Sequence, residues 1–157
     1  QQYGLNSNNI ILSNMYGPYD HFEEKRSHAV GAIIRKVLDA KLNNINMVKI
    51  WGSGKQEREW LYVEDGVKAI TKSFELSSGC NTFNIGTNKT VSIKELAELI
   101  KIKSKWEGSF TYDTTEPEGV LKKSVDGNYG NNLISWGPKV NIELGIEKTI
   151  SWYLENV

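Results

Sequence analysis

The stretch WGSGKQEREW, Trp51 to Trp60, holds the residue types of a phosphate-binding loop, because two glycines are followed by lysine and arginine. A Walker loop places a glycine five residues before its Gly-Lys pair and serine or threonine directly after it. Lys49 and Gln56 stand at those positions, and a dinucleotide-binding turn would need a third glycine where Glu57 stands. The spacing therefore predicts no backbone cradle for a phosphate, and the stretch needs another explanation.

A second residue able to do chemistry is His28, which precedes the apolar pattern of an expected helix. An imidazole changes its charge near neutral pH, so it can take up or release a proton during a reaction. A single histidine at a helix start is more often an ordinary polar residue. The residues alone leave both interpretations of His28 open.

Composition limits the kinds of protein that the chain can be. Its 157 residues are 39% hydrophobic and 24% charged, which is typical of one globular domain. Nineteen basic residues balance nineteen acidic ones, so bulk charge favours neither nucleic acid nor a membrane surface as a partner. The single cysteine, Cys80, excludes an internal disulfide, and we expect no metal site. No apolar run approaches the ~20 residues of a membrane span and no signal peptide is visible, so a cytoplasmic protein is expected.

Four segments have the apolar period of an amphipathic helix, and they must position the candidate residues. They cover 27–41, 63–74, 92–100 and the region from about 141 onward. Ser92 and Glu95 form a capping-box pattern at the start of the third segment. The expected buried faces are Val30, Ile33, Ile34, Val37 and Leu38; Val63, Val67, Ile70 and Phe74; Ile93, Leu96, Ala97 and Ile100; Ile142, Ile146, Ile150 and Tyr153.

Strands are expected at 9–13, 46–51 and 81–86, with a weaker candidate at 109–113. Because these strands alternate with the helices, they predict βα units and a mostly parallel sheet. Residues 114–139 are turn-rich and poorly periodic, which indicates either an ordered functional loop or disorder.

Five segments carry a family resemblance: NMYGPYDHF from Asn14, SHAVGAIIRK from Ser27, WGSGKQEREWLYVED from Trp51, FNIGTNKTVSIKELAELI from Phe83, and ISWYLEN near the end. In order and spacing they resemble the C-terminal half of extended short-chain dehydrogenases that act on nucleotide sugars, the NAD-dependent epimerase/dehydratase family. The fucose-synthase branch is the most similar. The resemblance implies an α/β fold, the C-terminal part of a Rossmann-type enzyme with its small substrate-binding subdomain. Residues 1–157 would be the substrate-binding half, and the N-terminal cofactor-binding half would be absent.

The resemblance also assigns roles near the start of the chain. Leu12, Ser13, Asn14 and Met15 would lie at the nicotinamide end of the cofactor. His28 would be the catalytic acid/base that inverts sugar carbons next to a 4-keto group, together with a cysteine of the missing half. The alternative for the first four residues is a strand end followed by a turn.

The resemblance explains the opening stretch as well. Trp51 would be an apolar wall of the substrate pocket, and the Arg58 guanidinium would bind the diphosphate. Gly52 and Gly54 would let the chain turn sharply between them. The structural alternatives are that Trp51 belongs to the core and that Arg58 pairs with Glu59 or Glu64.

Several residues depart from the branch pattern. Lys36 stands where related proteins place an arginine on the substrate, and Gly31 stands where they place a proline. The segment 113–123 resembles a loop that closes on the nucleotide, and Glu118 is its substrate-binding candidate. Glu116 and Lys122 replace a lysine and an arginine in this loop, so a nucleotide other than GDP stays open.

The implied activity belongs to the complete protein. It would epimerise GDP-4-keto-6-deoxymannose at C3 and C5 and reduce C4 with NADP or NAD as cofactor. The chain lacks the Tyr-x-x-x-Lys pair of the superfamily, so alone it is expected to be inactive and monomeric, whereas the complete protein would form a homodimer. The alternatives are a UDP- or dTDP-sugar 4-epimerase or 4,6-dehydratase, and a non-catalytic nucleotide-sugar-binding module.

Overall fold

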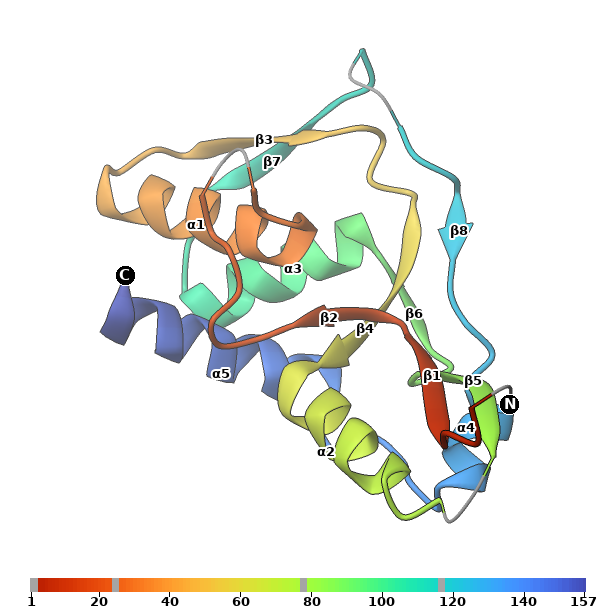
Figure 1. Cartoon of the computed structure of the whole chain (residues 1–157). Coiled ribbons are helices and arrows are strands. Elements are labelled where there is room, and N and C mark those ends of the chain that lie inside the picture. The colour runs from red at the N-terminus through yellow and green to blue at the C-terminus, as the bar shows by residue number, and fades with distance from the viewer. Residues whose placement is uncertain (1–2, 24–25, 77–78, 116–117) are drawn as a thin grey trace.

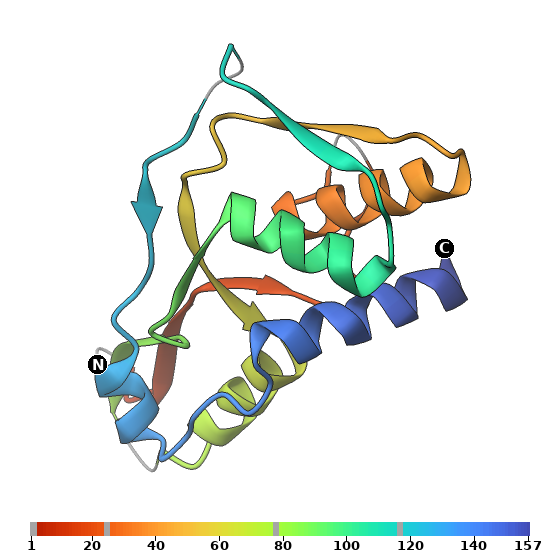
Figure 2. The ribbon, with the colours of Figure 1, turned by 180° about the vertical axis from the view of Figure 1, so that it is seen from behind.

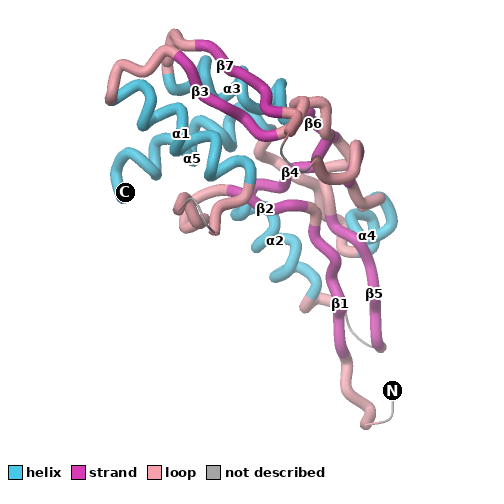
Figure 3. Tube along the Cα trace, turned by 90° about the horizontal axis from the view of Figure 1, so that it is seen from above, coloured by secondary structure: helices cyan, strands magenta, loops and turns pink. Residues whose placement is uncertain are grey.

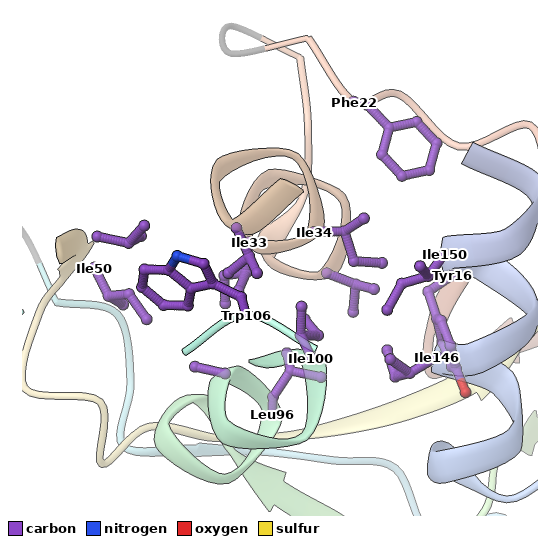
Figure 4. Packing of buried hydrophobic residues seen from close by; sticks show 14 of the residues in the cluster. Tyr16, Phe22, Ile33, Ile34, Ile50, Leu96, Ile100, Trp106, Ile146 and Ile150 are labelled. Atoms are coloured by element: carbon purple, nitrogen blue, oxygen red, sulfur yellow. The ribbon is translucent and has the colours of Figure 1, made fainter. Parts of the chain in front are cut away.

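Three helices surround the larger of two hydrophobic cores: α1 (Ala29–Leu42), α3 (Ile93–Ser104) and α5 (Ile142–Asn156). They are seen in a computed structural model that describes residues 3–23, 26–76, 79–115 and 118–157. Figure 1 shows the three helices side by side. In Figure 4 their side chains point into one core, with Trp106 near Ile33 of α1, and with Ile146 and Ile150 of α5 on the side of Ile34.

The predicted apolar faces of these helices are confirmed. Val30, Ile34 and Val37 of α1 are buried, as are Leu96 and Ile100 of α3. The capping box at the start of α3 is also formed. These helices were predictable because each turns one continuous apolar face to the core.

The strands pair mostly in parallel, as predicted, but they form three separate sheets. β1 (Ser7–Leu12) pairs with β5 (Cys80–Ile85), and β3 (Met47–Trp51) pairs with β7 (Ser109–Asp113). The third sheet orders β2 (Asn14–Tyr16), β4 (Glu57–Tyr62) and β6 (Thr90–Ser92), with β8 (Lys122–Lys123) also on β4. Only the β4–β6 pairing is antiparallel among the described strands. Figure 3 shows the β1–β5 pair at the opposite end from α1, α3 and α5.

The helix α2 (Val63–Ser73) forms, but its predicted apolar face is wrong. Val67 and Phe74 are 54% and 78% exposed. The buried face instead carries Gly66 and Ala69, and a Cβ at Gly66 would lie 2.7 Å from the Met15 Sδ. Small residues let this helix approach β2 closely, so the large apolar residues were misleading.

The region 114–139 is an ordered connection for the residues described, with two short elements that the sequence pattern did not predict. These are β8 and the helix α4 (Asn128–Leu133). Glu116 lies outside the described residues. No helix in the described part of the chain is long and apolar enough to cross a membrane.

Candidate functional site

A pocket of about 690 Å³ lies where β2, the start of α1, the turn after β3 and β4 meet. It brings together residues that are far apart in the sequence. Six of the nine predicted site residues line it: Asn14, Met15, His28, Trp51, Arg58 and Glu118. Leu12, Ser13 and Lys36 do not line it.

Asn14 and Met15 form one wall of the pocket from β2. The Asn14 side-chain amide donates to the Glu59 carbonyl oxygen at 3.1 Å, which fixes its orientation relative to β4. Leu12 packs against the smaller core, which includes Phe83. The predicted group of four is therefore split, since Asn14 and Met15 of β2 line the pocket and Leu12 at the end of β1 does not.

Ser13 is 8% exposed, and its hydroxyl has no hydrogen-bond partner among the described residues. A buried hydroxyl without a partner is unfavourable by about 1–3 kcal/mol. Its backbone N–H donates to the Ile85 carbonyl at 3.1 Å. Ser13 is thus held at the link between β1 and β2 with an unused polar group.

His28 is the N-cap residue of α1 and lies at the pocket edge. Its side chain is exposed and forms no capping hydrogen bond with the helix. The chain before it returns close to the helix, because a Cβ at Gly31 would lie 2.8 Å from the His21 carbonyl oxygen. Glycine, where the family pattern implies proline, therefore stands at a point where the chain comes close to the helix.

Trp51 is a wall of the pocket and not part of the core, since it is 61% exposed. Lys36 lies on its ring, with Nζ 5.6 Å from the ring centroid. The same lysine donates to the Lys49 carbonyl at 3.2 Å. Lys36 and Trp51 also line a second, adjoining pocket of about 270 Å³. Lys36 therefore does not line the first pocket itself but contacts Trp51, which does.

Arg58 is half-buried on β4, and Nη1 donates to the Glu57 carbonyl at 2.7 Å. The expected alternatives are absent, since within the described residues neither Glu59 nor Glu64 pairs with it. Gly119 lies against the guanidinium, where an added Cβ would be 3.0 Å from Nη2. The cation thus faces the pocket without a carboxylate partner in the described chain.

The turn after β3 is built as the sequence predicted. Gly52 and Gly54 have φ of +78° and +75°, a region that favours glycine. The Ser53 N–H between them donates to the Glu118 carboxylate. Glu118 therefore closes one side of the pocket by binding this turn.

The chain matches a known family over its first half. The model of the "NAD dependent epimerase/dehydratase family" matches residues 1–86. The chain belongs to this family. Among curated relatives, the probable GDP-L-fucose synthase 1 of Oryza sativa subsp. japonica is 36% identical over 99% of the chain, which covers 47% of that protein.

Solved structures of epimerase-family proteins have the same fold. An NADP-bound GDP-L-fucose synthetase from Naegleria fowleri matches with a TM-score of 0.87 and 25% identity, over 94% of this chain and 44% of that one. A UDP-glucose 4-epimerase from Thermotoga maritima, solved with UDP-glucose, has a TM-score of 0.87 and 25% identity, over 98% and 48%. The chain spans about half the length of the curated relatives it matches.

The sequence analysis of this epimerase-family chain did not predict that Gln56 and Trp60 line the pocket. Gln56 and Trp60 are 6% and 7% exposed, yet both line the pocket. Residues 58 and 60 share one face of a strand, so recognition of β4 would have placed Trp60 beside Arg58.

Tyr16 also lines this epimerase-family pocket. Burial is the main cause that raises the pKa of its phenol far above the usual range, and Tyr62 and Asp65 add to the effect. The phenol therefore stays protonated near neutral pH.

Proposed function

We propose that this chain is the substrate-binding part of an NAD(P)-dependent nucleotide-sugar epimerase/reductase that acts on a GDP-linked 4-keto-6-deoxy sugar. The observation that carries the proposal is the pocket itself. It joins a histidine at the start of α1 with an exposed tryptophan and an arginine from the β3–β4 region, and no carboxylate pairs with that arginine among the described residues. The names of the curated relatives, GDP-L-fucose synthases, support GDP as the nucleotide.

In this proposal His28 moves protons at the sugar. Carbons C3 and C5 flank the C4 carbonyl, so a base can remove their protons and leave an enolate, and a proton returned on the other face inverts the carbon. The imidazole suits this exchange because its side chain is exposed and has no capping hydrogen bond. Cys80 is not among the residues of the pocket, so a second proton donor would come from outside this chain.

The remaining pocket residues would hold the nucleotide. The planar guanidinium of Arg58 can bind a diphosphate by two parallel hydrogen bonds. Trp51 offers an apolar face, which Lys36 reinforces from behind. Glu118 would close the side of the pocket next to Ser53.

The cofactor would lie beside β2. Asn14 and Met15 are held at the pocket wall, and the unused hydroxyl of Ser13 offers a polar group to a neighbour on that side. Leu12 would contribute through packing only. When bound, NADP or NAD would supply the hydride that reduces C4. The family description and the NADP-bound relative support this cofactor.

A cofactor-binding half would complete the protein. The curated relatives are about twice as long as the part that the chain covers. Within the described chain, β1 pairs with β5 alone, and Ile11 on its outer face is 46% exposed. Parallel sheets are normally covered on both faces, so this exposed face is suited to docking that half. The chain alone would be inactive, and the complete protein would form a homodimer.

The test is the substitution His28→Asn in the complete protein. Deuterium uptake from solvent at C3 and C5 should be lost, while NADPH-dependent reduction of a 4-keto sugar nucleotide continues. His21→Asn is the matched control, because His21 is also exposed but contacts Arg26 and does not line the pocket. If His28→Asn keeps full deuterium uptake, the proton-transfer role is wrong.

A second candidate is a UDP- or dTDP-sugar 4-epimerase or 4,6-dehydratase. The close fold match to the UDP-glucose 4-epimerase favours it. Calorimetric titration of the chain with GDP, UDP and dTDP separates the candidates, since tightest binding of GDP supports the first. Binding without any turnover by the complete protein would instead support a non-catalytic module.

A further inference from the structure

A buried carboxylate on β4 binds backbone amides of two other segments of the chain. Glu59 has no exposed surface, although it lies between Arg58 and Trp60 of the pocket. Its Oε1 accepts from the backbone N–H groups of Thr87 at 2.5 Å and Asn88 at 3.0 Å. Its Oε2 accepts from the Val125 N–H at 2.9 Å.

The Val125 contact fixes a segment that we call the strap, residues 118–127. Figures 1 and 2 show it running along the outside beside β4, from the turn near β3 down to α4. At the pocket, Glu118 accepts from Ser53 and Gly119 lies against Arg58. Residues 118–124 are all exposed, and Val125 is the first that is partly buried.

The strap therefore depends on polar ties more than on apolar packing. Val120 and Leu121 are 65% and 68% exposed, so they contribute little burial. Along β4 the strap is also held by the pairing of β8 with β4, by the Glu57 N–H, which donates to the Leu121 carbonyl at 2.7 Å, and by the exposed Lys122–Glu57 ion pair. Of these ties, only that from Val125 ends on a fully buried charge, and such hydrogen bonds are the stronger ones.

We propose that Glu59 is a positioning residue for the pocket, which holds the strap so that Glu118 and Gly119 stay in place around the nucleotide. The inference rests on the proposed function. Glu59 also orients the other wall, because its backbone carbonyl accepts from Asn14. One residue thus connects the two sides between which a nucleotide sugar would lie.

The substitution Glu59→Gln tests this role, with Asp65→Asn as the matched control. Asp65 is equally buried and accepts from the backbone N–H groups of Lys139 and Val140 at 2.8 and 2.7 Å, but it does not touch the strap. Both variants should unfold at lower urea concentration. Only Glu59→Gln should speed amide hydrogen exchange in residues 118–125 and raise the Kd for GDP, by about fivefold.

Equal loosening of the strap in both variants, or an unchanged strap in Glu59→Gln, would overturn the inference. If Glu59→Gln does not fold, Val125→Pro removes the single N–H that reaches Oε2 and should give the same two effects. Failure of the unaltered chain to bind GDP would sink the proposed function and reduce Glu59 to a structural tie. In that case amide hydrogen exchange in residues 118–125 would still show whether the Glu59–Val125 hydrogen bond holds the strap.

Discussion

The ammonium group of Lys36 lies 5.6 Å from the centroid of the Trp51 ring, so a helix of the core supports an exposed aromatic wall of the pocket. A cation over an aromatic face contributes roughly 0.5–1 kcal/mol at an exposed site. The contact orders a side chain that would otherwise be free to turn away.

Replacing Trp51 with alanine should weaken nucleotide binding and leave the fold intact. The ring is 61% exposed, so its loss removes little buried surface, and the free energy of unfolding should change by less than about 0.5 kcal/mol. The Kd for GDP, measured by calorimetric titration, should rise by about tenfold because an aromatic contact is lost.

Lys36→Met is the matched variant, since it keeps a long side chain on the ring but removes the charge. Its effect on the Kd should be smaller, about threefold. A loss of several kcal/mol of stability in Trp51→Ala would show that the ring belongs to the core, which contradicts the pocket assignment.

Gly54→Ala should destabilise the turn after β3 by about 2 kcal/mol, because two penalties add. Its φ is +75°, and a Cβ there would lie 2.5 Å from the Tyr112 Cε1. Gly137→Ala is the control, since that position has open space and no positive φ. It should change the unfolding free energy by less than about 0.5 kcal/mol. Urea denaturation of both variants measures the difference, and equal values would contradict the role of the turn.

The sequence predicted an element well where its buried face consists of large apolar side chains, and poorly where small or charged residues are buried. The faces of α1, α3 and α5 were found because isoleucine, leucine and valine recur along them. α2 was found with the wrong face, because it buries glycine, alanine and serine instead. β4 was missed because charged residues occupy positions 57–59, one of them the buried Glu59.

Residues of the candidate pocket could be named from the sequence, but their arrangement could not. His28, Trp51 and Arg58 could be identified from the family resemblance, and the structure places them in one pocket. Periodicity could not show that Lys36 acts through the Trp51 ring. Nor could it show that Glu59 on β4 accepts hydrogen bonds from the backbone amides of Thr87 and Val125, which lie far along the chain.

The pH dependence of the Asp113 carboxyl group tests the contacts at the end of β7. Its pKa is lowered to about 2, chiefly by the Thr115 hydroxyl at 2.6 Å and then by Lys49 at 3.0 Å. Because the folded pKa lies below the ordinary value, the contribution of Asp113 to stability is present above about pH 4. It is lost as the pH falls toward 2.

Thr115→Val should raise the pKa of Asp113 toward its ordinary value, because the hydroxyl donor is removed while the backbone N–H of residue 115 still donates at 3.1 Å. Lys49→Met should also raise it, since this substitution removes both a hydrogen bond to the carboxylate and the positive charge beside it. The carboxyl carbon of Asp113, followed by NMR from pH 1.5 to 6, reports both shifts. An unchanged pKa of Asp113 in Thr115→Val would mean that the threonine hydroxyl does not hold this carboxylate.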